Sequence, residues 1–370
     1  MKTRFIVFML ISVLAAGTVS AQVTGGRLVS VSGKVWTQAP GSDEIRARAG
    51  EQLEPGTKIR TGADSQAEVT FEDGSILIVQ SQSSLVLSGI KRQPKKKTSI
   101  LIFFGRIWNK VSRKLGERVS YEVNTPIVVC GVRGTEFVAA VGEDGSVRIV
   151  VDQGVVNVSD VGRQETVNAG EEIQADVDTV GEVNAAEKQP DWEQWRSQKR
   201  EHVRQQGRDI IDKFKNRILS RTEKLEALRK QQAEIEVLRK NAIERAQAGD
   251  AEAIEEIRKY NQQLLEIAET IADLGDAAGS QFGLVDHFAD LAIDPRFQMI
   301  DGKYVEAEAA SMKRIKVIFD KMIAEGTDIS MEAMEKMLRE LSEGRRGSLK
   351  FDKGSSADDL WGNGEKDSKP

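Results

Sequence analysis

Cysteine and histidine are scarce in this chain of 370 residues, which has one Cys and two His. A structural zinc site takes four such ligands, and the three residues available, Cys130, His202 and His287, are scattered along the sequence. A zinc site made of four cysteines, or of two cysteines and two histidines, is therefore excluded. The single Cys has no partner for an internal disulfide, and its place in the apolar run 127–130 predicts a buried, inert thiol.

Proline is absent from residues 191–294, whereas residues 22–189 contain four Pro and 19 Gly. Gly and Pro mark the sharp turns between short strands, and a long stretch without Pro permits uninterrupted helices. The composition therefore predicts a β half followed by an α half, with a boundary near Pro190. Aromatic residues make up only 5% of the chain, so both cores must be mainly aliphatic.

A long apolar run is also missing at the amino terminus. The run from Phe5 to Ala16 has twelve residues, fewer than the roughly 20 that a spanning helix needs. It follows Lys2 and Arg4 and precedes the small residues Val19-Ser20-Ala21, which is typical of a secretory signal peptide. We expect residues 1–21 to be cleaved after Ala21, giving an exported chain; an uncleaved run would instead act as an anchor.

Two segments of the first half predict hairpins with the same turn. Residues 67–71 alternate apolar and polar, and after Asp73-Gly74 a second apolar run covers residues 76–79. The pattern returns at 137–141 and 147–151, so the tetrapeptide Glu-Asp-Gly-Ser stands at both 72–75 and 143–146. Alternation around Asp-Gly favours a β-hairpin. A calcium loop is a weaker reading, because calcium takes six to eight oxygen ligands.

Motifs for cofactors and covalent catalysis are absent. The glycines form neither GxGxxG before a helix nor GxxxxGK[ST], so no nucleotide cofactor is expected. Neither histidine lies near a Ser- or Cys-based motif; we expect His202 to be exposed on a charged helix and His287 to lie in a core beside Phe288. Carboxylates that converge from distant positions leave an Asp/Glu enzyme open.

Several segments of the first half resemble the FecR domain. They are residues 49–62 (AGEQLEPGTKIRTG), 71–75 (FEDGS), 105–108 (GRIW) and above all 125–137 (TPIVVCGVRGTEF). The resemblance extends over about residues 30–180. It implies a β-roll or short β-solenoid in a Gram-negative-type envelope, in the periplasm or otherwise exported, which interprets signals through protein contacts without catalysis.

The core of the resemblance has two readings. The motif residues are Gly131, Val132, Arg133, Gly134, Thr135, Glu136 and Phe137. Gly131 and Gly134 permit positive φ or close backbone approach, and Arg133 is placed to pair with Glu136 or to cap carbonyls, which favours a structural turn. Contact with a partner is the alternative. FecR regulators carry a cytoplasmic segment that holds a sigma factor, and we expect none here because the β half starts close to the cleavage site.

A basic stretch lies inside the first half. Residues 75–115 contain nine Lys and Arg and no acidic residue. The densest part, which we expect to be an exposed loop, contains Lys91, Arg92, Lys95, Lys96 and Lys97. A solvated loop is the plain reading; contact with an anionic envelope polymer or membrane surface is the sharper one, since clustered cations gain about 1 kcal/mol each there. Nucleic acid is not expected as a partner of an exported chain with net charge −5.

The second half reads as long helices. Asp191 is placed as an N-cap, and Trp192 and Trp195 share a helical face, where they pack on the β half or stack on a glycan. Apolar residues recur at a 3-4 spacing through residues 211–235 and 254–271, interrupted at Arg221 and Gln232, which predicts a coiled-coil-like hairpin turning at Gly249. Further helices are expected at 304–324 and at the Met-rich segment 330–341.

These patterns give the chain a β + α fold class with four segments: a signal peptide at 1–21, a FecR-like β domain at 22–189, an α-helical domain at 190–343 and a disordered tail at 344–370. We expect an exported, non-enzymatic envelope protein whose β module recognises a protein or envelope partner. The helices would mediate assembly, with self-association left open. The alternatives are a membrane-anchored FecR-type regulator and a glycan-binding module with Trp36 or Trp192 on its surface.

Overall fold

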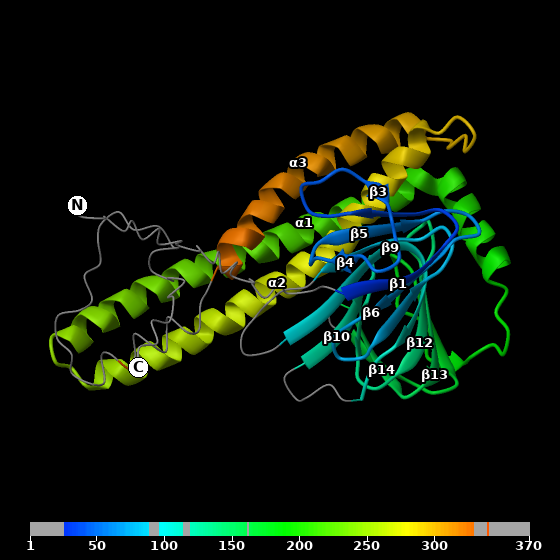
Figure 1. The fold of residues 1–370 in the computed structure, drawn as a ribbon. Helices are drawn as coiled ribbons and strands as arrows, with labels where there is room; N and C mark the ends of the chain where they lie inside the picture. The colour runs from blue at the N-terminus through cyan, green and yellow to red at the C-terminus, as the bar shows by residue number, and fades with distance from the viewer. Residues whose placement is uncertain (1–25, 89–95, 114–118, 161–162, 329–338, 340–370) are drawn as a thin grey trace, which may run out of the picture.

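The chain folds into a β-rich half followed by three helices. The computed structural model describes residues 26–88, 96–113, 119–160, 163–328 and 339. The signal peptide, the residues Lys91, Arg92 and Lys95, the helix expected at 330–341 and the tail therefore lie outside the described residues, as do the side chains of Lys96 and Lys97. Figure 1 shows the strands stacked beside a layer of long helices.

The strands form two ladders that share one long strand. The first ladder has the order β4-β1-β6-β7-β9-β12-β13-β16-β17, and the second has the order β3-β2-β5-β8-β9-β10-β11-β14-β15. The strand bounds are β1 Gly26–Ser32, β2 Val35–Gln38, β3 Ile45–Arg46, β4 Gln52–Leu53, β5 Thr57–Thr61, β6 Gln66–Thr70, β7 Ile76–Val79, β8 Ser84–Ser88, β9 Lys96–Lys110, β10 Val119–Asn124, β11 Val129–Val132, β12 Glu136–Val141, β13 Val147–Gln153, β14 Val155–Asp160, β15 Arg163–Asn168, β16 Glu171–Ala175 and β17 Asn184–Ala185.

Strand β9 passes from one ladder to the other at Gly105. Residues up to Phe104 pair with β8, and residues from Gly105 onward pair with β12. Gly105 has φ +103°, and a Cβ there would lie 2.4 Å from Ser83 Cα. Only glycine fits both the conformation and the close approach.

The two ladders enclose an aliphatic core, as the composition predicts. Ile100 and Ile102 of β9 and Phe137 of β12 are fully buried in it. The hydroxyl of Tyr121 in the second ladder donates to Asn109 Oδ1 in the first at 2.9 Å, which satisfies a polar pair inside an apolar interior. Cys130 is completely buried here, and burial raises the pKa of its thiol to about 12, so the expectation of an inert thiol is confirmed.

Two long helices form an antiparallel hairpin. Helix α1 (Trp192–Gln247) begins where Asp191 Oδ1 accepts the backbone N–H of Gln194 at 2.9 Å, which confirms the predicted N-cap. Gly249, with φ +101°, lies in the turn, and Asp250 Oδ1 accepts the N–H of Glu252 at the start of α2 (Glu252–Ile293). Pro295 follows α2, consistent with the bias of a residue before Pro away from helix.

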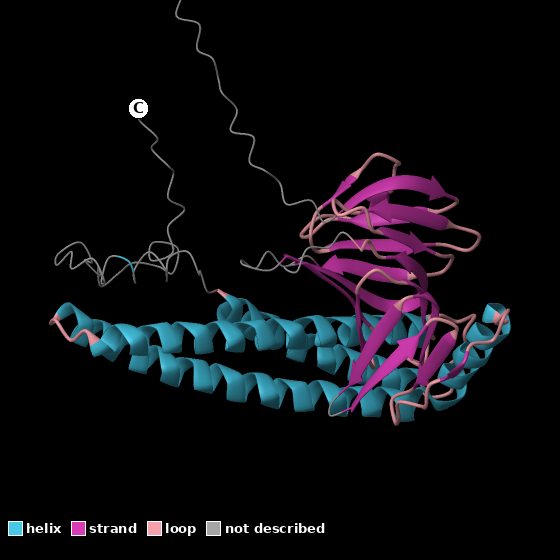
Figure 2. Cartoon of the chain, turned by 90° about the horizontal axis from the view of Figure 1, so that it is seen from below, coloured by secondary structure: helices cyan, strands magenta, loops and turns pink. Residues whose placement is uncertain are grey.

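Helix α3 (Gly302–Thr327) returns along the hairpin and stops part-way. At the carboxyl end of α3, Gln232 Nε2 of α1 donates to the carbonyl of Gly326 at 3.2 Å. The polar residue that interrupts the apolar spacing of α1 is thus hydrogen-bonded to the last turn of α3. Beyond this point α1 and α2 continue as a two-helix hairpin that projects away from the β half, as Figure 2 shows. No helix in the described residues has the length and apolar character to cross a bilayer.

Helix α2 lies directly on the outer face of β9. Gly279 and Gly283, four residues apart, face this strand: a Cβ at Gly279 would lie 2.6 Å from Leu101 Cδ2, and one at Gly283 would lie 2.2 Å from Phe103 Cδ1. Leu101 and Phe103 are thereby covered, although they point away from the core that holds Ile100 and Ile102. Strand β9 is therefore buried on both faces and anchors the helices.

The two hairpins predicted from Glu-Asp-Gly-Ser are confirmed as β6-β7 and β12-β13. The β-then-α order and the hairpin turning at Gly249 are also confirmed. The start of β9 differs from the expectation. The sequence predicted a loop through Lys97, whereas β9 begins at Lys96, where it pairs in parallel with β10.

Candidate functional site

The junction between the β half and the helices is built around the second Glu-Asp-Gly-Ser turn. Glu143, Asp144 and Ser146 expose only 9%, 3% and 5% of their surface. Asp144 Oδ1 accepts the backbone N–H of Ser146 at 2.9 Å, and Gly145 takes φ +82°. The turn is rigid, charged and buried, and helices α1 and α2 supply the surface that covers it.

The first Glu-Asp-Gly-Ser turn has the same backbone but no such cover. Asp73 Oδ1 accepts the N–H of Ser75 at 2.8 Å, and Gly74 has φ +83° with no atom within 4 Å of a hypothetical Cβ. At Gly145 the same Cβ would lie 2.4 Å from Phe214 Cζ and 2.8 Å from Leu284 Cδ2. One sequence motif therefore makes two identical turns, of which only the second docks.

Basic side chains from both helices meet the two buried carboxylates. Asp144 Oδ2 lies 2.8 Å from His202 Nδ1 and 3.7 Å from Lys199 Nζ. Glu143 accepts two hydrogen bonds from Arg200, at 2.7 and 2.8 Å, and its Oε2 lies 3.9 Å from His287 Nε2. Both histidines of the chain thus face adjacent acids of one turn.

These contacts shift the pKa values of the groups involved. The hydrogen bond that His202 Nδ1 donates to Asp144 raises the pKa of His202 above its ordinary 6.5, against the opposing effect of partial burial. Burial acts to raise the pKa of Glu143, but the His287 imidazole and the Arg200 guanidinium outweigh it and lower the pKa below 4.5. The junction therefore favours charged forms of both groups.

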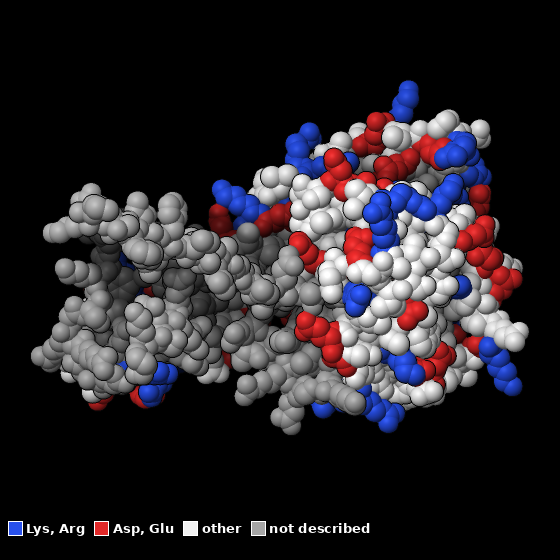
Figure 3. Space-filling model, in the orientation of Figure 1, with Lys and Arg blue, Asp and Glu red and all other residues white. Residues whose placement is uncertain are grey.

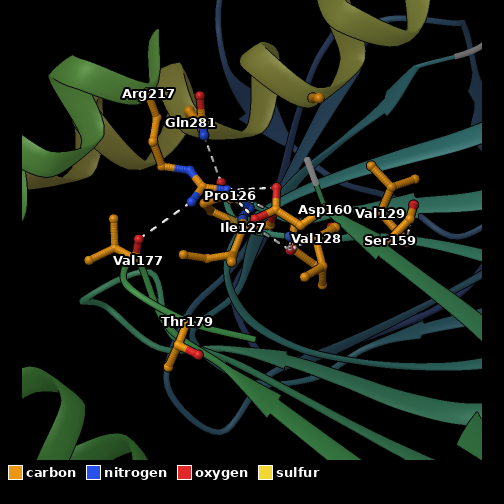
Figure 4. A network of polar contacts seen from close by, with 12 residues as sticks. Pro126, Ile127, Val128, Val129, Ser159, Asp160, Val177, Thr179, Arg217 and Gln281 are labelled. Atoms are coloured by element: carbon orange, nitrogen blue, oxygen red, sulfur yellow. Dashed lines mark hydrogen bonds and ion pairs between the residues drawn. The ribbon is translucent and has the colours of Figure 1, made fainter. Parts of the chain in front are cut away.

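A second contact holds the start of segment 125–137 (Figure 4). The Ser280 hydroxyl donates to the carbonyl of Thr125, and Gln281 Nε2 donates to the carbonyl of Pro126, both at 2.8 Å. Arg217 of α1 donates to the carbonyl of Ile127 at 3.3 Å. Residues 125–127 lie between β10 and β11 and belong to no strand. Each of their three carbonyls accepts a hydrogen bond from a helix side chain, which satisfies these backbone acceptors without water.

The same Arg217 fixes the end of β14. Its Nη2 lies 2.8 Å from both oxygens of Asp160 and its Nη1 donates to the carbonyl of Val177 at 3.4 Å. Figure 4 shows the guanidinium between these groups. One side chain of α1 therefore joins three separate segments of the β half.

A third contact buries Asp276 of α2 against the second ladder. Its two carboxylate oxygens accept hydrogen bonds from the hydroxyls of Ser88 and Ser99, each at 2.8 Å. Asn124 Nδ2 donates to Ser99 Oγ at 3.0 Å. Polar side chains on β8, β9 and β10 thus match one buried carboxylate, which adds directionality to the apolar packing of α2 on β9.

The rest of segment 125–137 makes the corner between β11 and β12. Gly134 has φ +63°, and a Cβ there would lie 2.5 Å from Arg113 Cγ; Thr135 is fully buried and its hydroxyl donates to the carbonyl of Val155 at 2.9 Å. Glu136 pairs with Lys110 at 2.6 Å rather than with Arg133, and Phe137 lies in the core. Gly131 has ordinary φ within β11.

The tryptophan pair packs at the start of α1. Trp192 and Trp195 meet edge to face at 6.3 Å, and the guanidinium groups of Arg106 and Arg148 lie 5.0 and 5.2 Å from the Trp192 ring. A cavity of about 30 Å³ remains between Arg106 and the two rings, which is room for about one or two waters. Trp36 is likewise stacked by Arg60, at 4.0 Å. Arginines thus stack on the two indoles suggested for glycan contact.

Metal ions need a group of ligand side chains held close together. The described residues contain no group of three or more His, Cys, Asp or Glu arranged to hold a metal ion. The buried acids at the junction are matched by basic or hydroxyl side chains. Figure 3 shows Lys and Arg interspersed with Asp and Glu over the described part of one face of the molecule, without a large field of one sign.

Comparison with known proteins identifies the β half. The family model described as FecR protein matches residues 57–157. This part of the chain is therefore similar to the FecR family. The match runs from β5 into β14, which is narrower than residues 30–180.

Solved structures add a distant likeness. Two crystal structures described as a "putative anti-sigma factor" from Parabacteroides distasonis ATCC 8503 are similar at 20% identity, with a TM-score of 0.30. Each similarity covers 35% of this chain and 58% of the solved chain, so this chain spans little more than half of those structures. No curated protein matches the chain.

Sequence reasoning located the turn and the FecR segment but missed the junction. His202 and His287 were expected in unrelated places, and the structure brings both to the turn at 143–146. Asp276 and Arg217 belong to no motif that could be recognised in the sequence. The four-residue spacing of Gly275, Gly279 and Gly283 was the available signal, because small residues recurring on one helix face permit close packing.

The two turns provide a matched test of the junction. Alanine at either Gly74 or Gly145 forces a side chain into positive φ, at about 1–2 kcal/mol. Gly145→Ala must also displace Phe214 and Leu284, which adds about 1–3 kcal/mol of overpacking. We expect urea unfolding, followed by circular dichroism, to show a larger loss of stability for Gly145→Ala than for Gly74→Ala; equal losses would show that the second turn is not docked.

Proposed function

We propose that this protein is an exported, non-enzymatic envelope protein in which the FecR domain recognises a protein partner and the helices mediate assembly. This proposal rests on one observation. Helices α1 and α2 donate hydrogen bonds to the backbone carbonyls of Thr125, Pro126 and Ile127, at the start of the FecR-like segment 125–137. A contact made by the domain is thereby coupled to the position of the helices. In fold terms, we propose that the two ladders are a β-roll or short β-solenoid.

The projecting hairpin is the part of the helical half suited to assembly. Past the end of α3, Ile235, Leu264 and Ile267 still belong to the main core. Towards the tip, the two helices bury a small separate cluster, formed by Ala242, Ile243, Ala253 and Ile257. Val237 and Leu238 remain 59% and 48% exposed. The hairpin adds little to the main core, so a role in contacts with other molecules explains its length better than stability does.

Shortening the hairpin tests this role. Arg239 faces Asn261 and Arg245 pairs with Glu256, so deletion of 236–242 together with 258–264 removes seven residues from each helix at matching positions and keeps the heptad phase. We expect this variant to fold but to lose the proteins captured by the mature chain from envelope extract, as identified by mass spectrometry. The control is Val317→Ser with Ile318→Ser, which reduces exposed apolar surface on α3. Unchanged capture by the shortened variant would refute assembly through the hairpin.

The second candidate is a membrane-anchored FecR-type regulator, favoured by the family match at 57–157. It requires the apolar run from Phe5 to Ala16 to remain attached as an anchor. Mass measurement of the amino terminus of the exported protein separates the two candidates. We expect the first residue to be Gln22, because Ala21 ends a typical cleavage site; retention of Met1 would favour the anchored regulator.

We further propose that Lys91, Arg92, Lys95, Lys96 and Lys97 contact an anionic envelope polymer or lipid surface. Clustered cations gain about 1 kcal/mol each at such a surface. Glutamate at Lys95, Lys96 and Lys97 should therefore release envelope-associated protein into the soluble fraction. Glutamine at the same positions, which removes charge without reversing it, is expected to give a smaller release. An unchanged partition of the glutamate variant would reject the contact.

A further inference from the structure

The only two histidines of the chain come from different helices and meet neighbouring acids of one turn. His202 of α1 contacts Asp144 at 2.8 Å and His287 of α2 lies 3.9 Å from Glu143. Histidine is the side chain whose charge changes between about pH 5 and 8. Both histidines therefore lie at the junction between the β half and the helices.

We propose that this junction is an acid-tightened latch: protonation of His202 and His287 clamps α1 and α2 onto Glu143 and Asp144, and loss of those protons loosens the turn. This inference concerns how the two halves are held together and goes beyond the proposed partner recognition. It requires neither export nor a particular partner.

The groups packed around the turn at 143–146 come from several elements besides the turn itself. Permanent cations come from α1, where Lys199 and Arg200 face Asp144 and Glu143. The connection from α2 to α3 contributes Asp294, whose pKa is lowered chiefly by hydrogen bonding to Arg296 and also by the charge of Arg200. Strand β9 contributes the uncharged ring of Phe104, stacked on His287 at 3.8 Å.

The direction of the effect follows from linkage. His202 has a raised pKa in the folded protein, so its contribution is complete below 6.5 and disappears as pH rises through the folded value. Glu143 has a lowered pKa, so its contribution is present above 4.5 and is lost only as pH falls through the folded value. Docking is therefore strongest in mildly acidic solution, between these two limits.

The geometry of His287 favours a switch over a simple structural contact. Its ring is held by Phe104 and is 14% exposed, and within the described residues its Nε2 has no hydrogen-bond partner. A small movement of the turn brings Glu143 into hydrogen-bonding range of this nitrogen. The neutral ring leaves a buried polar atom unsatisfied or dependent on water, which costs free energy, whereas the charged ring attracts the carboxylate.

Hydrogen exchange read by mass spectrometry measures the latch in the full chain. Peptides covering 140–148 report on the docked turn, and peptides covering 70–77 report on the undocked sister turn. After correction for the intrinsic rate at each pH, we expect protection of 140–148 to fall about three- to tenfold between pH 5.5 and 7.5, as one proton linkage allows. Protection of 70–77 should stay constant.

Variants assign the change to the histidines. In His202→Gln with His287→Gln, protection of 140–148 should be low and independent of pH. In His202→Lys, which keeps a positive charge at both pH values, protection should fall less than in the original chain. A decline of the original size in the double glutamine variant, or no decline in the original chain, would overturn the proposal. If the double variant fails to fold, His202→Lys decides alone: a full decline there overturns the latch.

Discussion

The burial of two adjacent carboxylates in the turn at 143–146 constrains the rest of this structure. An ionised acid removed from water is strongly destabilising unless cations and hydrogen bonds replace the solvent. Their own hairpin supplies hydrogen bonds from Ser146 to Asp144, whereas the cations that face the two acids lie on the helices. Arg200, Lys199 and His202 must therefore come from α1, and His287 from α2. Both helices have to be in place at once, which fixes where each crosses the β half.

Glycine at position 145 makes that arrangement possible. A polar turn can approach apolar side chains this closely only if its tip carries no Cβ, and Phe214 and Leu284 lie where a Cβ would point. The apolar contact holds the helices near the turn, while the ion pairs on either side determine their rotation. Apolar packing alone tolerates alternative arrangements, whereas buried charges penalise every arrangement in which they lose a partner.

The sequence predicted local structure well and the junction poorly, and the reason is physical. Alternation around Asp-Gly fixes a hairpin because the turn chemistry is contained in four residues; it therefore predicts the turns at 72–75 and 143–146 equally. Which of the two docks depends on Phe214 and Leu284, which are about 70 and 140 residues away along the chain. The N-cap at Asp191 and the buried Cys130 were predictable for the same local reason. His202 and His287 gave no local signal of the junction because the acids that they face, Asp144 and Glu143, are about 60 and 140 residues away along the chain.

The segment 125–137 links the helices to the corner between β11 and β12. Its first three residues are held by α1 and α2 through backbone carbonyls, and its later residues turn the corner from β11 to β12, the strand that leads directly into the docked turn. The contacts at 125–127 and 143–146 are joined along the chain by β11 and β12, so a displacement of the corner between these two strands would act on both contacts. Backbone carbonyls accept these hydrogen bonds whatever side chains the loop carries, so the helices place few demands on its sequence. Within the same segment Cys130, Thr135 and Phe137 are buried, so its side chains pack the β half while its backbone carbonyls accept the hydrogen bonds that hold the helices.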